Sequence, residues 1–208
     1  MVEEKSLRRI FVDMILYKDE YIAIYIKEPG EDSEKLNLPE ELCGYKTISR
    51  LDKPVGGLLA LAAPNSSSKL KDVEFHKEYI AVVSGTMETA QGSMLDFLYH
   101  DKRNNKTFPV KRMRNGVKEA SLEYQVLGVN ERHDLSLVKI VLGTGRTHQI
   151  RVQFASRKHP LYGDGKYGSR FKGLPALCCR RIEFIHPIKN SPMVFETTPE
   201  GEPWNLFI

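Results

Sequence analysis

The feature that most restricts the fold is an apolar run at residues 57–63, which contains no polar side chain. Pro64 and Asn65 follow the run and end it. A short apolar run bounded by turn residues predicts a β-strand that is buried on both faces. Such a strand needs a core around it, and a chain of 208 residues can bury about 70% of its surface on folding. We therefore expect residues 1–208 to form a single domain.

The rest of the chain reads mainly as strands. Apolar alternation or enrichment in β-branched and aromatic residues predicts strands at 10–17, 21–26, 79–83, 122–126, 135–142, 181–185 and 193–197. Short helices are predicted at 66–73 and, capped by Thr147, at 148–158. Because strands and helices do not alternate strictly, we expect an α+β fold with a mainly antiparallel sheet.

The charge is unevenly distributed along the chain. Residues 1–101 carry a net charge of −6, and residues 102–208 carry +10, which together give the modest +4 of the whole chain. Residues 102–118, called the cationic segment below, contain seven Lys or Arg and no acid. Residues 86–118 also lack long apolar runs, so we expect a mobile or inserted segment there. The asymmetry points to a polyanion such as nucleic acid, or to an uneven but solvated surface.

The cysteines and the N-terminus exclude several classes of protein. Cys43, Cys178 and Cys179 form neither an even set nor a Cys-x-x-Cys pair, which argues against a disulfide framework and a zinc site. The first residues lack the apolar stretch of a signal peptide, and no apolar run is long enough to span a bilayer. We expect a cytoplasmic protein that has no metal site and does not bind membranes.

Four segments carry candidate chemistry: residues 49–57, 76–85, 142–151 and 159–168. In the first, Asp52 stands between Arg50 and Lys53, whose charges lower the pKa of a carboxylate and keep it ionised. An ionised Asp can act as a nucleophile or base, or simply form a surface ion pair. In the second, Tyr79 offers an aromatic face and a hydroxyl, or lies at a core edge.

The third segment resembles an anion site, because a glycine turn precedes the predicted helix and its backbone N–H groups. Its His148 is more simply a neutral helix-start histidine bonded to backbone than a metal ligand. In the fourth segment the glycines permit tight turns, and Asp164 is interpreted as a turn-former rather than a catalyst.

In this order, the four segments resemble the RluA-type pseudouridine synthases. The resemblance rests on Arg50-Leu-Asp52, on Lys77-x-Tyr79-x-Ala81, on Thr144-Gly-Arg-Thr-His-Gln-Ile-Arg151 and on the turns at residues 159–168, with Lys27-Glu-Pro-Gly30 before them. It implies a pseudouridine synthase-like fold with a mainly antiparallel central sheet flanked by helices and a central cleft. It also implies RNA as the partner and no cofactor or metal.

The resemblance also implies roles for particular residues. Asp52 would be the nucleophile, Arg151 would pair with it, and Tyr79 would stack on the uracil and help to remove the C5 proton. Arg50 would fill the gap left by the flipped base or hold the RNA backbone. Further RNA contacts are expected from Lys53, Arg146, His148 and Gln149, from Ile150 beneath the base or in the core, and from Lys111, Arg112 and Arg114 in the cationic segment.

Some residues depart from the family pattern. Ser49 replaces the usual His, and Val55-Gly56-Gly57 replaces Thr-Ser-Gly. These departures support the alternative of a non-catalytic RNA-binding relative. A glycosidase-like hydrolase is a third class, although no second carboxylate recurs near Asp52 in the sequence. We expect a monomer without an S4 domain; the choice between rRNA and tRNA stays open.

Overall fold

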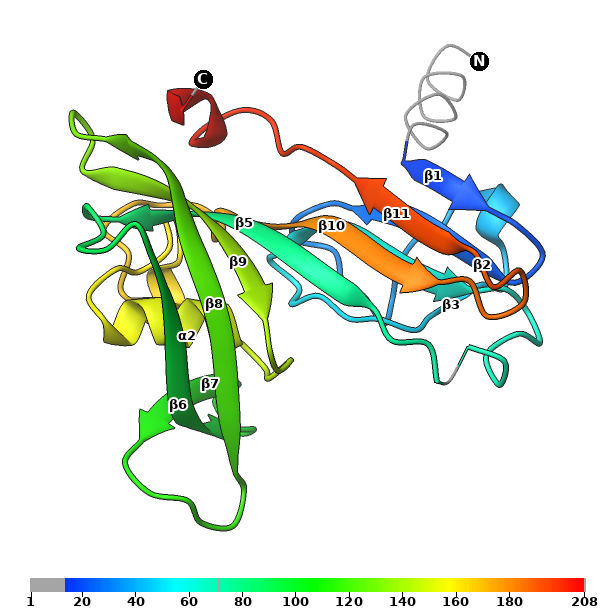
Figure 1. Cartoon of the computed structure of the whole chain (residues 1–208), viewed down its shortest axis with the longest axis horizontal. Coiled ribbons are helices and arrows are strands. Elements are labelled where there is room, and N and C mark those ends of the chain that lie inside the picture. Colours follow the sequence, from blue (N-terminus) through cyan, green and yellow to red (C-terminus); the bar gives the residue numbers. More distant parts are fainter. Residues whose placement is uncertain (1–13, 71, 208) are drawn as a thin grey trace. The chain divides into compact units, whose positions relative to one another are not determined.

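The computed structural model describes residues 14–70 and 72–207 (Figure 1). Two compact units divide the chain. The first unit contains the chain up to Lys77 together with Cys179–Thr198, and the second contains Glu78–Cys178 and the residues from Pro199 onward. The single domain inferred from sequence stays a prediction. No helix within the described residues combines the length and the apolar character that a membrane crossing requires.

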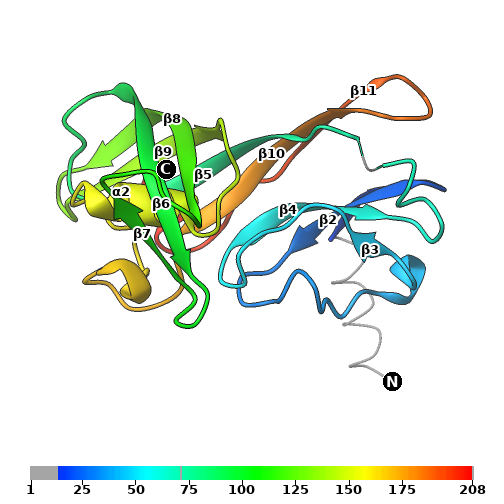
Figure 2. The same cartoon turned by 90° about the horizontal axis from the view of Figure 1, so that it is seen from below.

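The first unit is built around strand β4 (Gly56–Ala62), in which all seven residues are buried. This confirms the prediction from the apolar run. β4 pairs antiparallel with β2 (Ile22–Lys27), which pairs antiparallel with β1 (Ile15–Lys18), and the short β3 (Lys46–Thr47) also pairs with β4 (Figure 2). The part of the predicted first strand before residue 14 lies outside the described residues. A 3-10 turn, η1 (Glu40–Leu42), precedes β3.

The late strands predicted from sequence are also confirmed. They are β10 (Leu177–Ile185) and β11 (Pro192–Glu196), which form an antiparallel hairpin in register from Arg181↔Glu196 to Ile185↔Pro192. β10 and β5 (His76–Ser84) each have residues in both units.

The second unit contains an antiparallel sheet in the order β5, β9 (Leu135–Leu142), β8 (Val117–Asn130), β6 (Gln91–Asp101) and β7 (Lys106–Val110). The predicted alternation on β8 is confirmed: Leu122 is buried, whereas its neighbour Glu123 is exposed. The chain turns from β8 to β9 after Asn130, as the sequence predicts.

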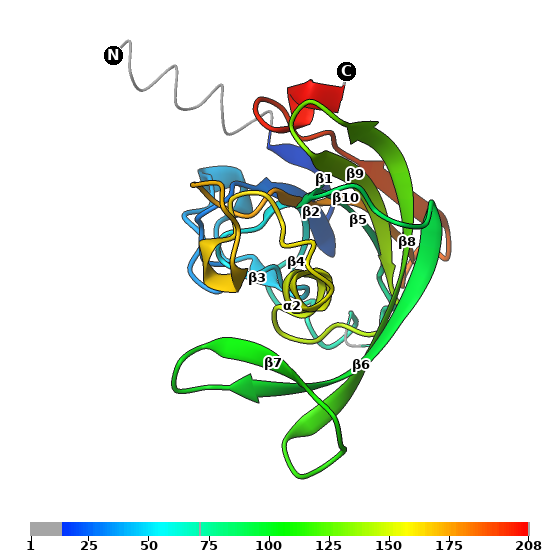
Figure 3. The same ribbon diagram turned by 90° about the vertical axis from the view of Figure 1, so that its left-hand side faces the viewer.

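Helix α2 (Gln149–Ser156) lies on the inner side of the curved strands β9, β8 and β6 (Figure 3). Val152 packs with Leu98 of β6 and Ala120 of β8. Phe154 is fully buried, and its ring meets that of Tyr124 edge-on at 5.8 Å. Burial of such a side chain stabilises the fold by about 1.5–3 kcal/mol.

Two expectations need correction, and a third stays a prediction. Residues 86–118, expected to be mobile or inserted, form β6 and β7 and lead into β8, and their mobility or insertion stays a prediction; β6 buries only Met94 and Leu98, so it leaves no apolar run to recognise. Of the helix predicted at 66–73, residues 66–70 form consecutive turns instead, with Lys69 N–H bonded to Ser66 C=O at 3.0 Å, and residue 71 lies outside the described residues.

The expectation of several flanking helices is also wrong. Within the described residues α2 is the one α-helix, accompanied by the 3-10 turns η1, η2 (Gly165–Tyr167) and η3 (Trp204–Phe207). The mainly antiparallel sheet is confirmed, because every strand pair named above is antiparallel.

Candidate active site

Asp52 of the first unit lies half-buried in the loop between β3 and β4, and hydrogen bonds hold the backbone on both sides of it. Val55 N–H donates to the Asp52 carbonyl at 2.9 Å and closes a tight turn. On the other side, Leu51 N–H donates to Ser33 Oγ at 3.2 Å, and Ser33 Oγ donates back to the Leu51 carbonyl at 2.9 Å. The carboxylate is thus presented on a braced loop.

Lys27 braces the same loop from beneath, a role that the sequence analysis missed. Its fully buried ammonium donates to the carbonyl oxygens of Glu28 and Glu31 at 2.9 Å each and of Lys53 at 3.2 Å. Burial lowers the pKa of Lys27 to about 8, and the negative charges of Glu31, Asp32, Asp52 and Glu28 oppose that decrease. Lys27 is therefore electrostatically coupled to Asp52.

The departures from the family pattern have local structural explanations. Ser49 Oγ accepts a hydrogen bond from Ala60 N–H at 3.0 Å, so this buried hydroxyl is satisfied on β4. Gly56 lies against Pro29, where an added Cβ would come within 2.9 Å of the proline ring. Val55 is buried in the core. The residues at these positions thus fit the loop that carries Asp52.

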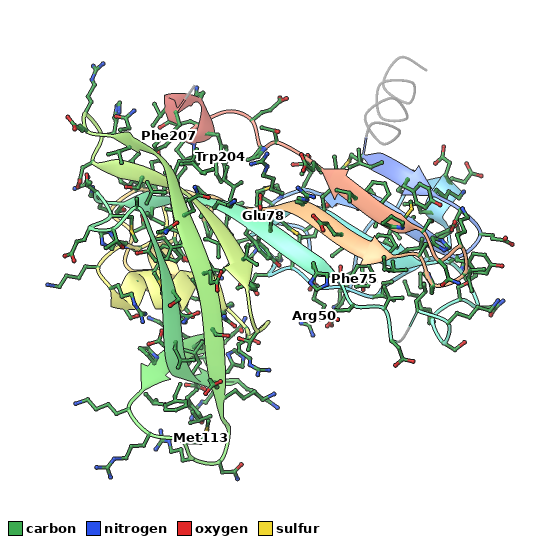
Figure 4. The ribbon with its side chains drawn as sticks, in the orientation of Figure 1. Arg50, Phe75, Glu78, Met113, Trp204 and Phe207 are labelled. Carbon is green, nitrogen blue, oxygen red and sulfur yellow. The ribbon has the colours of Figure 1, made fainter. Side chains whose placement is uncertain are left out.

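Arg50 and Lys53, the predicted RNA contacts of this loop, are exposed. Figure 4 labels the Arg50 side chain. Arg50 forms an ion pair of 3.0 Å with Glu34, in which the two side chains are 77% and 59% exposed. A pair this exposed contributes little to stability, so the guanidinium can exchange Glu34 for another anion at low cost.

Arg151 of the second unit is held by an aspartate that the sequence analysis had assigned to a turn. Its Nε donates to Asp164 Oδ2 at 2.7 Å and its Nη2 to Asp164 Oδ1 at 2.8 Å. The two side chains are only 5% and 1% exposed. A bidentate, buried pair fixes the plane of the guanidinium. The predicted pairing of Arg151 with Asp52 stays a prediction.

Tyr167 supports Arg151 on a second side. Its ring centroid lies 5.1 Å from the guanidinium carbon of Arg151, which is within range of a cation–π interaction. The Tyr167 hydroxyl accepts a hydrogen bond from Thr107 N–H at 2.9 Å and lies 2.9 Å from His148 Nδ1. Burial raises the pKa of Tyr167. Arg151 therefore lies within a network that joins α2, η2 and β7.

The start of α2 differs from its prediction. His148, not Thr147, occupies the N-cap, in a left-handed conformation with φ of 55°. Its Nδ1 lies 2.9 Å from the Tyr167 hydroxyl, and the bond to backbone expected from the sequence stays a prediction.

Gln149 braces the loop before the helix. Its Oε1 accepts from Thr144 Oγ1 at 2.8 Å and from Arg146 N–H at 3.0 Å, and its Nε2 donates to Ser121 C=O at 3.0 Å. The predicted RNA contacts of His148 and Gln149 stay predictions, and both side chains are buried.

The two other apolar candidates lie in the core of the second unit. Tyr79 is 7% exposed on β5, where it pairs in register with Ile140 of β9. Ile150 is 4% exposed in the first turn of α2. The ring of Tyr79 or the side chain of Ile150 can contact a base only if the substrate reaches it. The predicted roles of both residues therefore stay predictions.

A pocket of about 680 Å³ opens between the end of β6 and the loop before α2. Four cations line it, namely Lys102, Arg103, Lys118 and Arg146. Its one lining carboxylate, Asp101, accepts hydrogen bonds from Arg103 N–H and from Asn104 and is engaged in the turn. The pocket therefore suits a polyanion. Beyond it, Lys111, Arg112 and Arg114 are all exposed in the loop between β7 and β8.

Comparison with known proteins identifies the family. The RNA pseudouridylate synthase family matches residues 18–156, a range that includes Asp52, Tyr79 and Arg151. The chain belongs to this family of RNA-modifying isomerases. This confirms the resemblance to the RluA-type pseudouridine synthases. An uncharacterized RNA pseudouridine synthase of Bacillus subtilis, YhcT, is 30% identical over 93% of this chain and 68% of its own length.

Other relatives match over smaller shares of their length. An uncharacterized RNA pseudouridine synthase of Aquifex aeolicus is 32% identical over 72% of this chain and 51% of its own length. The ribosomal large subunit pseudouridine synthase D of Borreliella burgdorferi is 37% identical over 65% of this chain but only 42% of its own length.

Solved structures show the same fold. Human RNA pseudouridylate synthase domain containing 4 superposes with a TM-score of 0.71 and 17% identity, over 95% of this chain and 92% of that chain. Human RNA pseudouridylate synthase domain containing 1 gives a TM-score of 0.73 and 20% identity, over 89% and 82% of the two chains. The chain therefore has the pseudouridine synthase fold.

Proposed function

We propose that this protein isomerises specific uridines of structured RNA, either rRNA or tRNA, to pseudouridine. The observation that carries the proposal is the family match over residues 18–156, because that range contains Asp52, Tyr79 and Arg151 together. The braced Asp52 loop supports it, since a nucleophile must be held in a productive geometry before the substrate arrives.

The reaction breaks the C1′–N1 bond of uridine, rotates the base and joins C1′ to C5. The proton leaves C5 and N1 gains one, so the overall change is an isomerisation without a co-reactant. The Asp52 carboxylate is the nucleophile, and it attacks either C1′ of the ribose or the uracil base. Tyr79 stacks on the uracil and assists removal of the C5 proton. The uridine must first leave the base stack, which costs a few kcal/mol. Contacts between the flipped base and the active site must offset that cost.

Arg151 orients the Asp52 carboxylate in this proposal. A guanidinium carries five N–H donors, and the pair with Asp164 uses two of them. One guanidinium can therefore serve two carboxylates at once. Asp164 and Tyr167 act as positioning residues, because they fix the plane of Arg151. Lys27, buried below the Asp52 loop, holds that loop through its hydrogen bond to the Lys53 carbonyl.

In this proposal, exposed cations of each unit bind the RNA. Arg50 fills the gap that the flipped base leaves, and Lys53 contacts phosphate or ribose. In the second unit, Arg146 and the cationic segment follow the RNA backbone. Phosphate contacts give affinity that depends on salt but carry no sequence information, so the target uridine is selected by other means.

The test is release of tritium from RNA labelled at C5 of uridine, with pseudouridine mapped in the product. Release together with a new pseudouridine supports the proposal. RNA binding without release would favour the non-catalytic relative. Loss of the base or cleavage of the strand would favour a hydrolase.

A further inference from the structure

The hairpin of β6 and β7 carries an apolar face that the active-site proposal does not use. Residues that are paired across the hairpin point to the same side. The pairs Phe97↔Val110 and Tyr99↔Phe108 therefore share one face. Tyr99 is 36% exposed and Phe108 40% exposed. The opposite face holds Leu98, which packs with Val152 of α2. The aromatic face (Phe97, Tyr99, Phe108 and Val110) is thus turned away from the helix.

Cations lie over the two exposed rings. Lys106 Nζ is 5.6 Å from the ring centroid of Phe108, and the guanidinium carbon of Arg114 is 5.5 Å from that of Tyr99. Interleaved rings and cations match the two components of an unpaired nucleotide, a base with a π face and a phosphate. Arg114 can also stack on a base through its guanidinium plane.

The surrounding charge favours RNA over a protein or lipid partner. The hairpin leads into the cationic segment, which has seven Lys or Arg and no acid, and three of these cations, Lys102, Arg103 and Lys106, lie within the hairpin. A carboxylate borders the segment at each end: Asp101 is engaged by Arg103 and Asn104 in the turn, and Glu119 of β8 is exposed and pairs in register with Phe97. β7 is the last strand of its sheet, so a strand of RNA can follow the hairpin without displacing a neighbouring strand.

We infer that Tyr99 and Phe108 form a stacking platform for unpaired bases of the substrate RNA, other than the reacting uridine. The inference rests on the proposed function only for the identity of the RNA. A duplex hides its base faces and would meet this surface through phosphates alone. The platform therefore selects substrates in which the target lies beside a single-stranded stretch.

The test compares Tyr99→Leu, Phe108→Leu and the double variant with the native protein. Leu keeps apolar area but removes the π face. Phe108→Tyr retains an aromatic ring and serves as the conservative variant. Leu95→Ala is the matched control, because Leu95 is 63% exposed on the same strand but lies beyond the β7 pairing. Thermal unfolding of each variant checks the fold.

Binding is measured by fluorescence anisotropy with a 12-nucleotide oligouridine and with a blunt RNA duplex of equal length. The double variant should bind the oligouridine about tenfold or more weakly, because stacking contributes that much per base. The affinity of the double variant for the duplex should stay near the native value. The affinity of Phe108→Tyr for the oligouridine should also stay near the native value. In addition, 2-aminopurine placed in the single strand should be quenched by the native protein and by Phe108→Tyr but not by the double variant.

Three results would overturn the inference. They are unchanged oligouridine binding, an equal loss for the duplex, and an equal loss in Leu95→Ala. Sedimentation that showed a native dimer and a monomeric double variant, with unchanged RNA binding, would assign the face to a second copy of the chain and also overturn it. These readouts do not require turnover. Absence of tritium release from native protein would therefore remove the proposed function and leave the platform open to the same measurements.

Discussion

The guanidinium of Arg151 and the carboxylate of Asp164 form a bidentate pair that is almost completely buried. Thirteen residues separate them in the sequence, and one is on α2 while the other directly precedes η2. A buried charge that loses its partner is far more costly than an exposed one. The pair is therefore a sensitive point for both stability and activity.

Asp164→Asn should lower the free energy of unfolding by about 3 kcal/mol, because it removes the negative charge from a buried bidentate ion pair. It should also lower kcat, since Arg151 is no longer fixed. Urea unfolding and tritium release measure the two effects. Asp134→Asn is the control: Asp134 pairs with Arg170, but both side chains are more than half exposed, and the loss should stay below about 1 kcal/mol. Equal losses in the two variants would contradict the assignment.

Asp52→Asn should abolish tritium release and leave RNA affinity within about twofold of native, because it removes the nucleophile and little else. Anisotropy with the same RNA measures affinity. Glu40→Gln removes an exposed carboxylate of the same unit and should change neither quantity. If Asp52→Asn formed pseudouridine at the native rate, Asp52 would be excluded as the nucleophile.

Replacement of Lys111, Arg112 and Arg114 by Gln should weaken RNA binding across sequences. It should also reduce the slope of log affinity against log salt by about 2, because three phosphate contacts are lost. The matched control replaces Arg132, Lys158 and Lys172, three exposed cations of the same unit outside the cationic segment. An unchanged slope in the first variant would exclude the segment as an RNA contact.

Asp19→Asn tests a polar cluster in the first unit. Asp19 Oδ2 lies 3.0 Å from His186 Nε2 and 2.8 Å from Lys189 Nζ, and Asp19 Oδ1 accepts from Tyr21 and Ile22 N–H. Burial alone would raise the pKa of Asp19, but these hydrogen bonds hold it well below its usual range. A lowered pKa in the folded state stabilises the fold above the unfolded-state pKa near 3.9.

That contribution disappears as pH falls from about 4 toward the folded-state pKa. Urea unfolding should therefore show native protein more stable than Asp19→Asn at pH 7, with the difference shrinking below pH 4. Asp72→Asn, an exposed carboxylate of the same unit, should show little difference at either pH. A difference for Asp19→Asn that is independent of pH would argue that packing, rather than charge, accounts for it.

Much of the fold follows from local patterns. β4 could be predicted because no polar residue interrupts it, and β8 and β9 because their side chains alternate. β6 and β7 were not predicted as strands, because their apolar residues form an exposed face that is interrupted by Pro109 and followed by cations. Residues 66–70 form turns rather than the predicted helix because Ser and Asn side chains compete for the backbone groups and stabilise turns.

The candidate site was predictable only where a motif is contiguous. Asp52 and Arg151 stand in recognisable segments, whereas the partner of Arg151 is supplied by a separate turn. Lys27 ends a strand, where a lysine is normally solvated, and nothing local indicates that its ammonium lies beneath another loop. Contacts of this kind depend on tertiary packing, which periodicity does not encode.

The hydrogen bond between Asp19 and His186 joins residues 167 positions apart in the chain. The first unit thus combines β1, the first strand of the described residues, with the β10–β11 hairpin, which lies far along the chain. While the ribosome synthesises residues 78–178, strands β1, β2 and β4 lack the β10–β11 hairpin. Contacts of such long range slow folding, because the intervening loop must close before they form. A nascent chain of this protein therefore holds its Asp52 loop in an incomplete unit until β11, which ends at Glu196, has been synthesised.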